Sequence, residues 1–133
     1  GVSDSAWESL VSALEVQPVQ AVSPQGGFGA YDIKPRRLLE LGYRCVPRDR
    51  DKTARPFPRE RFLNDPLLQY HFIEQSLVRY HKDLTSGSLT KPADMSMAGA
   101  LAILHRGGRG ALRSWPNLFE HTRARYEAAQ GAF

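Results

Sequence analysis

Glu15 is the carboxylate of this 133-residue chain that is best placed for acid–base chemistry. It closes an amphipathic helix whose apolar residues recur at helical spacing: Trp7, Leu10, Val11 and Leu14. A carboxylate at a helix C-terminus meets the negative end of the helix dipole, and partial burial disfavours its charged form. Both effects would raise its pKa, as a general acid at neutral pH requires. The competing interpretation is an exposed helix-end glutamate with no chemical role.

Asp32 is the natural second carboxylate, because it follows the turn Gly29-Ala30-Tyr31 and precedes a helix that begins at Pro35. Glycoside hydrolysis uses two carboxyl groups roughly 5 to 9.5 Å apart, and their separation sets the stereochemistry of the product. If Asp32 faces Glu15, the two side chains form such a pair. The alternative is that Asp32 simply caps the helix that follows it.

The remaining reactive side chains give weaker signals. His71 and Glu74 are three residues apart on one predicted helix, which is a metal-site spacing, but one pair supplies too few ligands. We therefore predict no metal and no cofactor. Cys45 is the only cysteine, which excludes an internal disulfide and a thiolate zinc cluster. Neighbouring Arg44 and Arg48 would lower the pKa of its thiol, yet no other feature there indicates a nucleophile.

The segment His105 to Gly110, with the sequence HRGGRG, permits three interpretations. Glycines flanked by arginines could admit a phosphate to backbone N–H groups, although the spacing is not that of a P-loop. The segment could also be a tight turn between two packed helices. The third possibility is the wall of a polysaccharide groove, where missing side chains let a sugar ring approach.

Apolar periodicity and helix boundary signals predict the elements that position these residues. Capping boxes are expected at Ser5–Glu8 and at Asn117–Glu120. Helices are expected over about 5–15, 35–41, 66–84, 95–105 and 117–129. Residues 44–61 are charged and contain prolines, so we expect a long surface loop there.

These elements predict a mainly α fold, with four to six helices around a central apolar helix. Residues 95–105 are apolar almost all round, as is typical of a helix at the centre of a domain. At most a small β-hairpin is expected near residues 26–33. We expect one domain over residues 1–133, and no run is long and apolar enough to span a membrane.

The charge balance favours an anionic partner. The net charge is +4, and 14 of the 18 cationic residues are arginines. Nucleic acid, a teichoic or peptidoglycan polymer and a membrane surface all fit this balance, which is also common in soluble domains without an anionic ligand.

The order of the motifs resembles the lysozyme-like lytic transglycosylases, especially their phage-tail and secretion-associated relatives. Glu15-Val16-Gln17 stands where the family has E-S-G, and Gly29-Ala30-Tyr31-Asp32 stands where it has G-L-M-Q or G-K-Y-Q. Residues 38–43 match a short helix that ends in L-x-x-x-G-Y. Residues 62–69 match F-L-x-x-P-x-L-Q, and residues 104–110 match A-H-L-G-G-x-G. The resemblance covers residues 7 to about 115.

The resemblance implies a lysozyme-like α+β fold and cleavage of the bond between N-acetylmuramic acid and N-acetylglucosamine in peptidoglycan. Glu15 would protonate the glycosidic oxygen, and in a hydrolase Asp32 would activate the attacking water. In a lytic transglycosylase a muramyl hydroxyl would close an anhydro ring instead. The candidate substrate-binding residues are Gly29, Tyr31, Tyr80, His105 and Arg106.

The departures from the family motifs keep two alternatives open. Val16 and Gln17 replace the family's serine and glycine, and Asp32 replaces its glutamine. The chain could therefore be a non-catalytic, glycan-binding or structural module of a phage tail or secretion machine. A basic helical nucleic-acid binder that uses residues 106–113 and the last helix is the less favoured alternative. The peptidoglycan hypothesis implies an extracytoplasmic or virion-associated protein.

Overall fold

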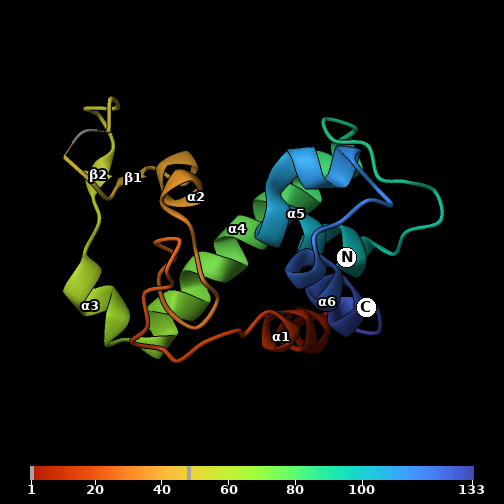
Figure 1. Ribbon diagram of the computed structural model, residues 1–133, viewed down its shortest axis with the longest axis horizontal. Helices are drawn as coiled ribbons and strands as arrows, with labels where there is room; N and C mark the ends of the chain where they lie inside the picture. Colours follow the sequence, from red (N-terminus) through yellow and green to blue (C-terminus); the bar gives the residue numbers. More distant parts are fainter. Residues whose placement is uncertain (1, 48) are drawn as a thin grey trace. The chain divides into compact units, whose positions relative to one another are not determined.

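The computed structural model describes residues 2–47 and 49–133, and it is mainly helical (Figure 1). Within these residues it contains six helices and two short strands: α1 (Asp4–Ala13), α2 (Pro35–Glu40), β1 (Tyr43–Arg44), β2 (Arg55–Pro56), α3 (Arg59–Leu63), α4 (Pro66–Ser86), α5 (Met97–Arg113) and α6 (Glu120–Ala129). The prediction of a mainly α chain with four to six helices is confirmed. No helix in the described ranges combines the length and the apolar character that crossing a membrane requires.

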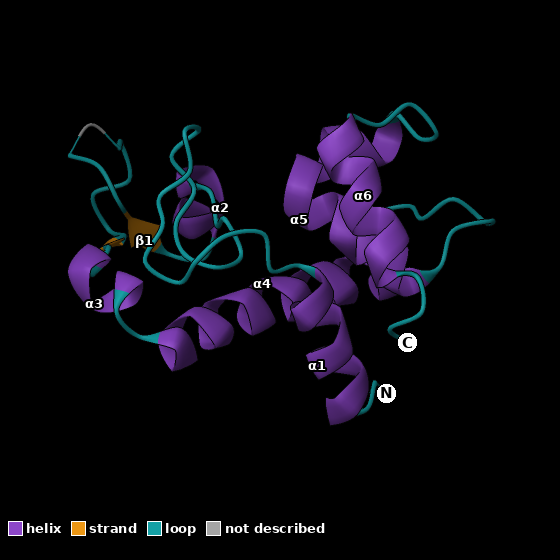
Figure 2. Ribbon diagram, turned by 60° about the horizontal axis from the view of Figure 1, so that its bottom comes forward, coloured by secondary structure: helices purple, strands orange, loops and turns teal. Residues whose placement is uncertain are grey.

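The chain divides into two compact units. The helical unit consists of Gly1–Leu14 and Leu77–Phe133, and the loop-rich unit consists of Glu15–Ser76. Helix α4 begins in the loop-rich unit and ends in the helical unit. Figure 2 shows that the two units differ in secondary structure: helices dominate the helical unit, and loops dominate the loop-rich unit. The expectation of a single domain over residues 1–133 stays a prediction.

Helix α5 is the central apolar helix that the sequence predicts. All residues from Ala98 to Leu104 are buried, whereas a surface helix buries only one stripe. Ser96 caps the start of the helix, since its side chain accepts a hydrogen bond from the Gly99 N–H at 3.0 Å. Gly108 adopts φ 74° and ψ −171°, which kinks the helix. The glycines at 107, 108 and 110 predict that the helix breaks there, and the structure has instead a kink at Gly108, whose φ is positive.

Helix α6 packs against both α5 and α1 within the helical unit. A Cβ added to Gly99 would lie 2.5 Å from Cε1 of Tyr126, so α6 approaches α5 where α5 has no side chain. The ring of Trp115 packs against the ring of Tyr126, and the two centroids lie 4.9 Å apart. Arg125 donates from Nη1 to the Ala13 carbonyl at 2.9 Å, which satisfies a carbonyl in the last turn of α1.

Both predicted capping boxes are wrong. Ser3, not Ser5, caps α1, and its hydroxyl accepts a hydrogen bond from the backbone three residues on at 3.2 Å. Asn117 does not cap α6, because the helix begins only at Glu120, and the Asn117 N–H donates to the Ser114 carbonyl at 2.8 Å in the turn that follows α5. Phe119 stands at the cap position of α6 and makes no side-chain cap.

The loop-rich unit contains little regular structure beyond α2, α3 and the start of α4. Strands β1 and β2 run parallel, with Tyr43 opposite Arg55, inside a region that was expected to be loop. The predicted small hairpin corresponds to the antiparallel bridge between Phe28 and Ile33. Neighbouring rings in the aromatic core lie 4.7 to 5.2 Å apart between centroids. The rings belong to Phe28, Tyr43, Phe57, Phe62 and Phe72.

Candidate functional site

Glu15 follows α1 and is held next to the turn of residues 29–32. The N–H of Val16 donates to the Ala30 carbonyl at 2.8 Å, so the backbone that carries Glu15 is fixed against this turn. The Glu15 side chain is exposed, as in the competing interpretation, and the expectation of partial burial is wrong. The apolar stripe of α1 ends with Leu14, which is fully buried, and the next side chain projects beyond it. An exposed carboxylate is accessible to a substrate.

Gln17 provides a second tie between the two segments. Its side-chain Nε2 donates to the Gly29 carbonyl at 2.8 Å and lies 3.4 Å from the Gly27 carbonyl. Its backbone N–H also points to the Ala30 carbonyl at 3.4 Å. Gln17, which stands where the family has glycine, therefore has a structural role in this chain. It holds the glutamate segment to the turn.

Gln69 is the buried hub of the loop-rich unit. Its side chain is fully buried on the first turn of α4. Its Oε1 accepts a hydrogen bond from the Ala30 N–H at 2.9 Å. Its Nε2 donates to the Val19 carbonyl at 2.7 Å and to the Phe62 carbonyl at 2.8 Å. One amide therefore ties together the turn, the segment that follows α1, and the end of α3.

Gly29 faces this hub. It is buried and has φ 75°, a conformation that glycine adopts without strain. A Cβ at this position would lie 2.5 Å from Cδ of Gln69, so any side chain would displace the amide. The observed contact explains the glycine by packing, and its predicted contact with substrate stays a prediction.

The pKa of the Tyr31 phenol is raised partly by the charge of Glu15. The Tyr31 side chain is 6% exposed. Burial is the largest cause that raises the pKa of Tyr31 to about 12, followed by the negative charge of Glu15 and the neighbouring phenol of Tyr70. Tyr31 therefore stays protonated at neutral pH, and the negative charge of Glu15 adds to the effect of burial on its pKa.

Asp32 is enclosed. Its side chain is 5% exposed, its φ is 50°, and Oδ2 forms an ion pair with Nζ of Lys34 at 2.8 Å. A Cβ at Gly27 would lie 1.6 Å from Oδ1 of Asp32, so the glycine makes room for the carboxylate. Asp32 does not cap α2, because the cap position is occupied by Lys34 without a side-chain cap. The catalytic role of Asp32 stays a prediction, and its observed contact is the local ion pair with Lys34.

The other predicted binding residues belong to the helical unit. Tyr80 lies on α4 and is 5% exposed. His105 and Arg106 lie on α5 just before the kink, and both are half-buried. The structure thus brings Glu15 together with the turn of residues 29–32 in one unit. The binding roles of these three residues stay predictions.

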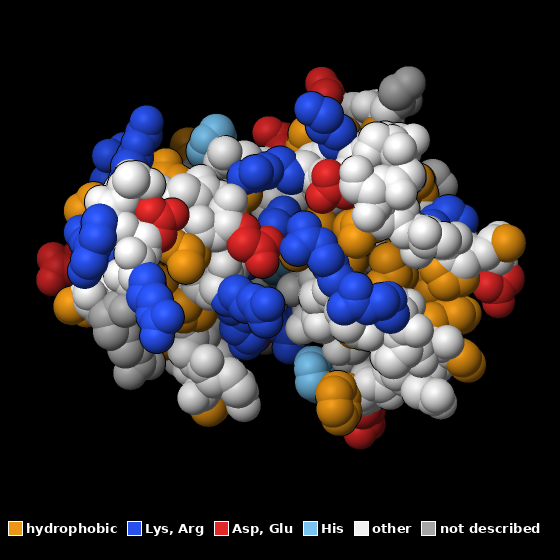
Figure 3. All heavy atoms as spheres, turned by 90° about the horizontal axis from the view of Figure 1, so that it is seen from above, with side chains coloured by type: hydrophobic (Ala, Val, Ile, Leu, Met, Phe, Trp, Pro, Cys, Tyr) orange, Lys and Arg blue, Asp and Glu red, His pale blue; other side chains and the backbone are white. Residues whose placement is uncertain are grey.

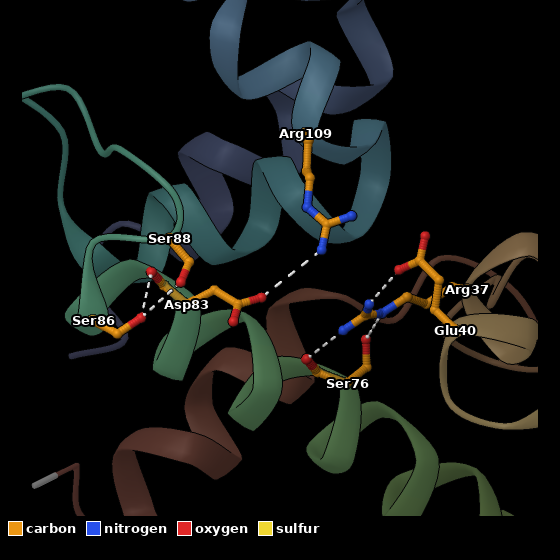
Figure 4. Close-up of polar contacts among 7 residues, drawn as sticks. All are labelled: Arg37, Glu40, Ser76, Asp83, Ser86, Ser88 and Arg109. Atoms are coloured by element: carbon orange, nitrogen blue, oxygen red, sulfur yellow. Dashed lines mark hydrogen bonds and ion pairs between the residues drawn. The ribbon is translucent and has the colours of Figure 1, made fainter.

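Two arginines, one in each unit, have acidic or serine partners, and of the two only Arg109 belongs to the candidate nucleic-acid surface (Figure 4). In the loop-rich unit, Arg37 donates from Nε to the Ser76 hydroxyl at 2.6 Å and pairs with Glu40 at 2.6 Å. In the helical unit, Arg109 lies 3.8 Å from the Asp83 carboxylate. Lysine and arginine side chains nevertheless form the most prominent charged clusters on the face in Figure 3.

The described residues contain no group of three or more His, Cys, Asp and Glu side chains that could hold a metal ion. Burial, followed by the charge of Asp49, raises the pKa of the Cys45 thiol. The expected lowering by adjacent arginines is therefore wrong, since desolvation disfavours the thiolate. Of those arginines, Arg48 lies outside the described residues.

Sequence reasoning missed Gln17 and Gln69 as residues that shape the site. A signal for Gln69 existed, because it is the last residue of the family phrase matched by residues 62–69. No local pattern marks Gln17, whose partners lie 10 and 12 residues away. Comparison with known proteins found no matching protein-family model, no matching curated protein and no matching solved structure.

Proposed function

We propose that the chain is a peptidoglycan-cleaving glycosidase in which Glu15 is the general acid. The observation that carries the proposal is the pair of ties from Val16 and Gln17 to the turn of residues 29–32. They fix the backbone on both sides of an accessible carboxylate, whose negative charge disfavours ionisation of the Tyr31 phenol. Fixed placement of the acid is what general acid catalysis requires of a protein. The order of the lysozyme-like motifs supplies the substrate class.

The reaction begins with a proton transfer. Protonated Glu15 gives its proton to the glycosidic oxygen between N-acetylmuramic acid and N-acetylglucosamine. The bond from the muramyl anomeric carbon to that oxygen breaks, and an oxocarbenium-like species forms. The Glu15 carboxylate left behind is negatively charged and stabilises this species electrostatically.

The surroundings of Asp32 favour the transglycosylase course over hydrolysis. Asp32 is buried and ion-paired with Lys34, so it is poorly suited to activate a water. In the transglycosylase course one carboxylate suffices. A hydroxyl of the same muramyl residue attacks the anomeric carbon, Glu15 takes the proton of that hydroxyl, and an anhydro ring closes. The product keeps all the atoms of the glycan and needs no water.

A non-catalytic glycan-binding or structural module is the second candidate. The observation that favours it is the exposure of Glu15, because burial is one of the two effects that would raise the pKa of a catalytic acid. In such a module the hydrogen bonds of Val16 and Gln17 would only stabilise the turn and would have no part in catalysis. It predicts binding to peptidoglycan without release of fragments.

Muropeptide release from purified sacculi tests the proposal. The wild-type protein should release glycan fragments with anhydro ends, and Glu15→Gln should lower the rate by about 10²- to 10⁴-fold, the usual contribution of a general acid. Glu8→Gln is the matched control, because Glu8 is an exposed glutamate on α1. It should leave the rate unchanged.

Mass analysis of the fragments separates the alternatives. Reducing ends in place of anhydro ends would assign a hydrolase and overturn the transglycosylase course. Equal release by the wild type and Glu15→Gln would remove Glu15 from the mechanism. If the wild type sediments with sacculi but releases nothing, the non-catalytic module replaces the enzyme.

A further inference from the structure

The helical unit contains a cavity of about 880 Å³ that is lined by the candidate substrate-binding residue Arg106 but by none of the residues in the proposed reaction. It lies between the end of α5, the connecting loop and the start of α6, and it is here called the α5–α6 cavity. The lining residues on which the argument depends are Arg106, Phe119, His121, Thr122 and Arg123.

Thr122 is the first sign that this cavity binds a ligand. Its side chain is 1% exposed and lines the cavity. Its Oγ1 is buried without a hydrogen-bond partner among the described residues. Buried hydroxyls in native proteins almost always have a partner, so this one calls for a group that the chain itself does not supply. The hydroxyl can donate to an acceptor in the cavity.

The start of α6 supplies the second sign. The N–H groups of the first helical turn have no partner within the helix, and Phe119 at the cap position makes no side-chain cap. The helix has ten residues, and its dipole places partial positive charge at this end. His121 and Thr122 of this turn both line the cavity. Uncapped amides at a helix start favour an anion.

The charges and the rim of the cavity complete the site. Arg106 and Arg123 line it, and none of its described lining residues is acidic. One Nη2 contact of Arg123, to the Pro116 carbonyl at 3.0 Å, holds the guanidinium in place and leaves further N–H donors. At the rim, Phe119 is 79% exposed and stacks on His121, with ring centroids 6.0 Å apart and planes 6° apart. This stack offers a flat apolar surface.

We propose that the α5–α6 cavity is a binding site for a small oxyanion, a carboxylate or a phosphate, on a ligand with a flat or apolar part. The oxyanion accepts hydrogen bonds from the Thr122 hydroxyl and from the first amides of α6. Arg106 and Arg123 neutralise its charge, and the remainder of the ligand lies on the Phe119–His121 stack. The site does not rest on the proposed glycosidase activity, because Glu15 and its turn take no part in it.

Isothermal titration calorimetry with two probes tests this site. One probe is inorganic phosphate, and the other is a peptidoglycan stem tripeptide that ends in a carboxylate. The wild type should bind at least one probe. Arg123→Gln should weaken this binding about tenfold or more, because hydrogen bonds to charged groups are the stronger kind. Thr122→Val should weaken it too, and Thr122→Ser, which restores the hydroxyl, should recover it.

Arg113→Gln is the control for net charge. Arg113 is exposed in the last turn of α5 and outside the cavity lining, so its loss should leave the affinity unchanged. Failure of the wild type to bind either probe would overturn the proposal. Equal weakening by Arg113→Gln and Arg123→Gln would do so as well, since it would indicate a diffuse charge effect. Arg123→Gln keeps the test decisive if Thr122→Val does not fold, because Arg123 is exposed.

Discussion

The two units are stabilised by different means. In the helical unit, consecutive buried residues of α5 and the close approach of α6 provide a core of apolar contacts. In the loop-rich unit, the turn that adjoins Glu15 is held mainly by polar side chains that reach across the chain. The amides of Gln17 and Gln69 form these polar ties, and the ion pair of Asp32 with Lys34 adds a local contact between residues two apart.

The difference follows from where the backbone hydrogen bonds go. A helix satisfies its own N–H and C=O groups, so its side chains are left to pack. An irregular segment that is buried must find partners elsewhere for the same groups. The amide of Gln69 supplies three such hydrogen bonds to residues 19, 30 and 62. The candidate site therefore depends on a few polar residues, and the helical unit depends on close apolar packing.

Replacing Gln69 with methionine should give the largest loss of stability. Methionine keeps the approximate length and volume, but it leaves one N–H and two carbonyls without their hydrogen bonds. The cost should be about 3–5 kcal/mol, since each buried group left unsatisfied costs about 1–3 kcal/mol. Chemical denaturation followed by circular dichroism measures the free energy of unfolding.

Gln75→Met is the control, because Gln75 lies on the same helix and is half-buried without a side-chain hydrogen bond among the described residues. We expect a change below about 0.5 kcal/mol, as for most substitutions of this kind. Similar losses in the two variants would show that Gln69 stabilises by its volume. The contrast between the units would then fail.

Gly99→Ala tests the helical unit on the same scale. The new Cβ would lie 2.5 Å from Cε1 of Tyr126, so α6 would have to shift. Overpacking of this kind costs about 1–3 kcal/mol, despite the better helix propensity of alanine. Gly110→Ala, on the same helix with open space around the new Cβ, should instead stabilise by about 0.5–1 kcal/mol. Thermal unfolding of both variants measures the two effects, and stabilisation by Gly99→Ala would contradict the packing argument.

Local sequence patterns predicted all the helices of the described residues except α3, because a helix satisfies its own backbone; α3 begins in the expected loop, and α5 runs on to Arg113 beyond the expected end at residue 105. The apolar spacing that ends at Leu14 and the proline at position 35 or 66 mark boundaries within one or two residues of those observed. The apolar character of residues 98–104 likewise predicted their burial. The caps were harder, because Ser3 and Ser5 are chemically alike and only the backbone geometry selects Ser3.

The site was predictable only in part. The order of the motifs predicted which segments matter, and Val16 does bond to the turn that contains Tyr31. The exposure of Glu15 was one of the two interpretations that the sequence offered. The hydrogen bonds of the Gln17 and Gln69 side chains were not predictable, because they join distant segments and no local periodicity encodes them.

The predicted effect with the narrowest range concerns Tyr31, because it is absent at neutral pH and is confined to alkaline pH. Burial, then the charge of Glu15 and the phenol of Tyr70, raises its pKa to about 12 from an ordinary value of 10.0. Between these values the unfolded chain loses the phenolic proton while the folded chain keeps it. The contribution of Tyr31 to stability is therefore complete below pH 10 and is lost as the pH rises toward 12.

Tyr31→Phe isolates this contribution, because phenylalanine keeps the ring and removes the titrating group. The variant should lose less stability than the wild type between pH 10 and pH 12, the window set by the raised pKa. Ultraviolet titration should show one late-titrating phenol in the wild type that is absent from the variant. In Glu15→Gln the late titration should move to lower pH, because the substitution removes a negative charge near the phenol. An unmoved titration would mean that Glu15 does not lie beside Tyr31 in solution, and the turn would then be held by its polar ties without presenting the carboxylate to the phenol.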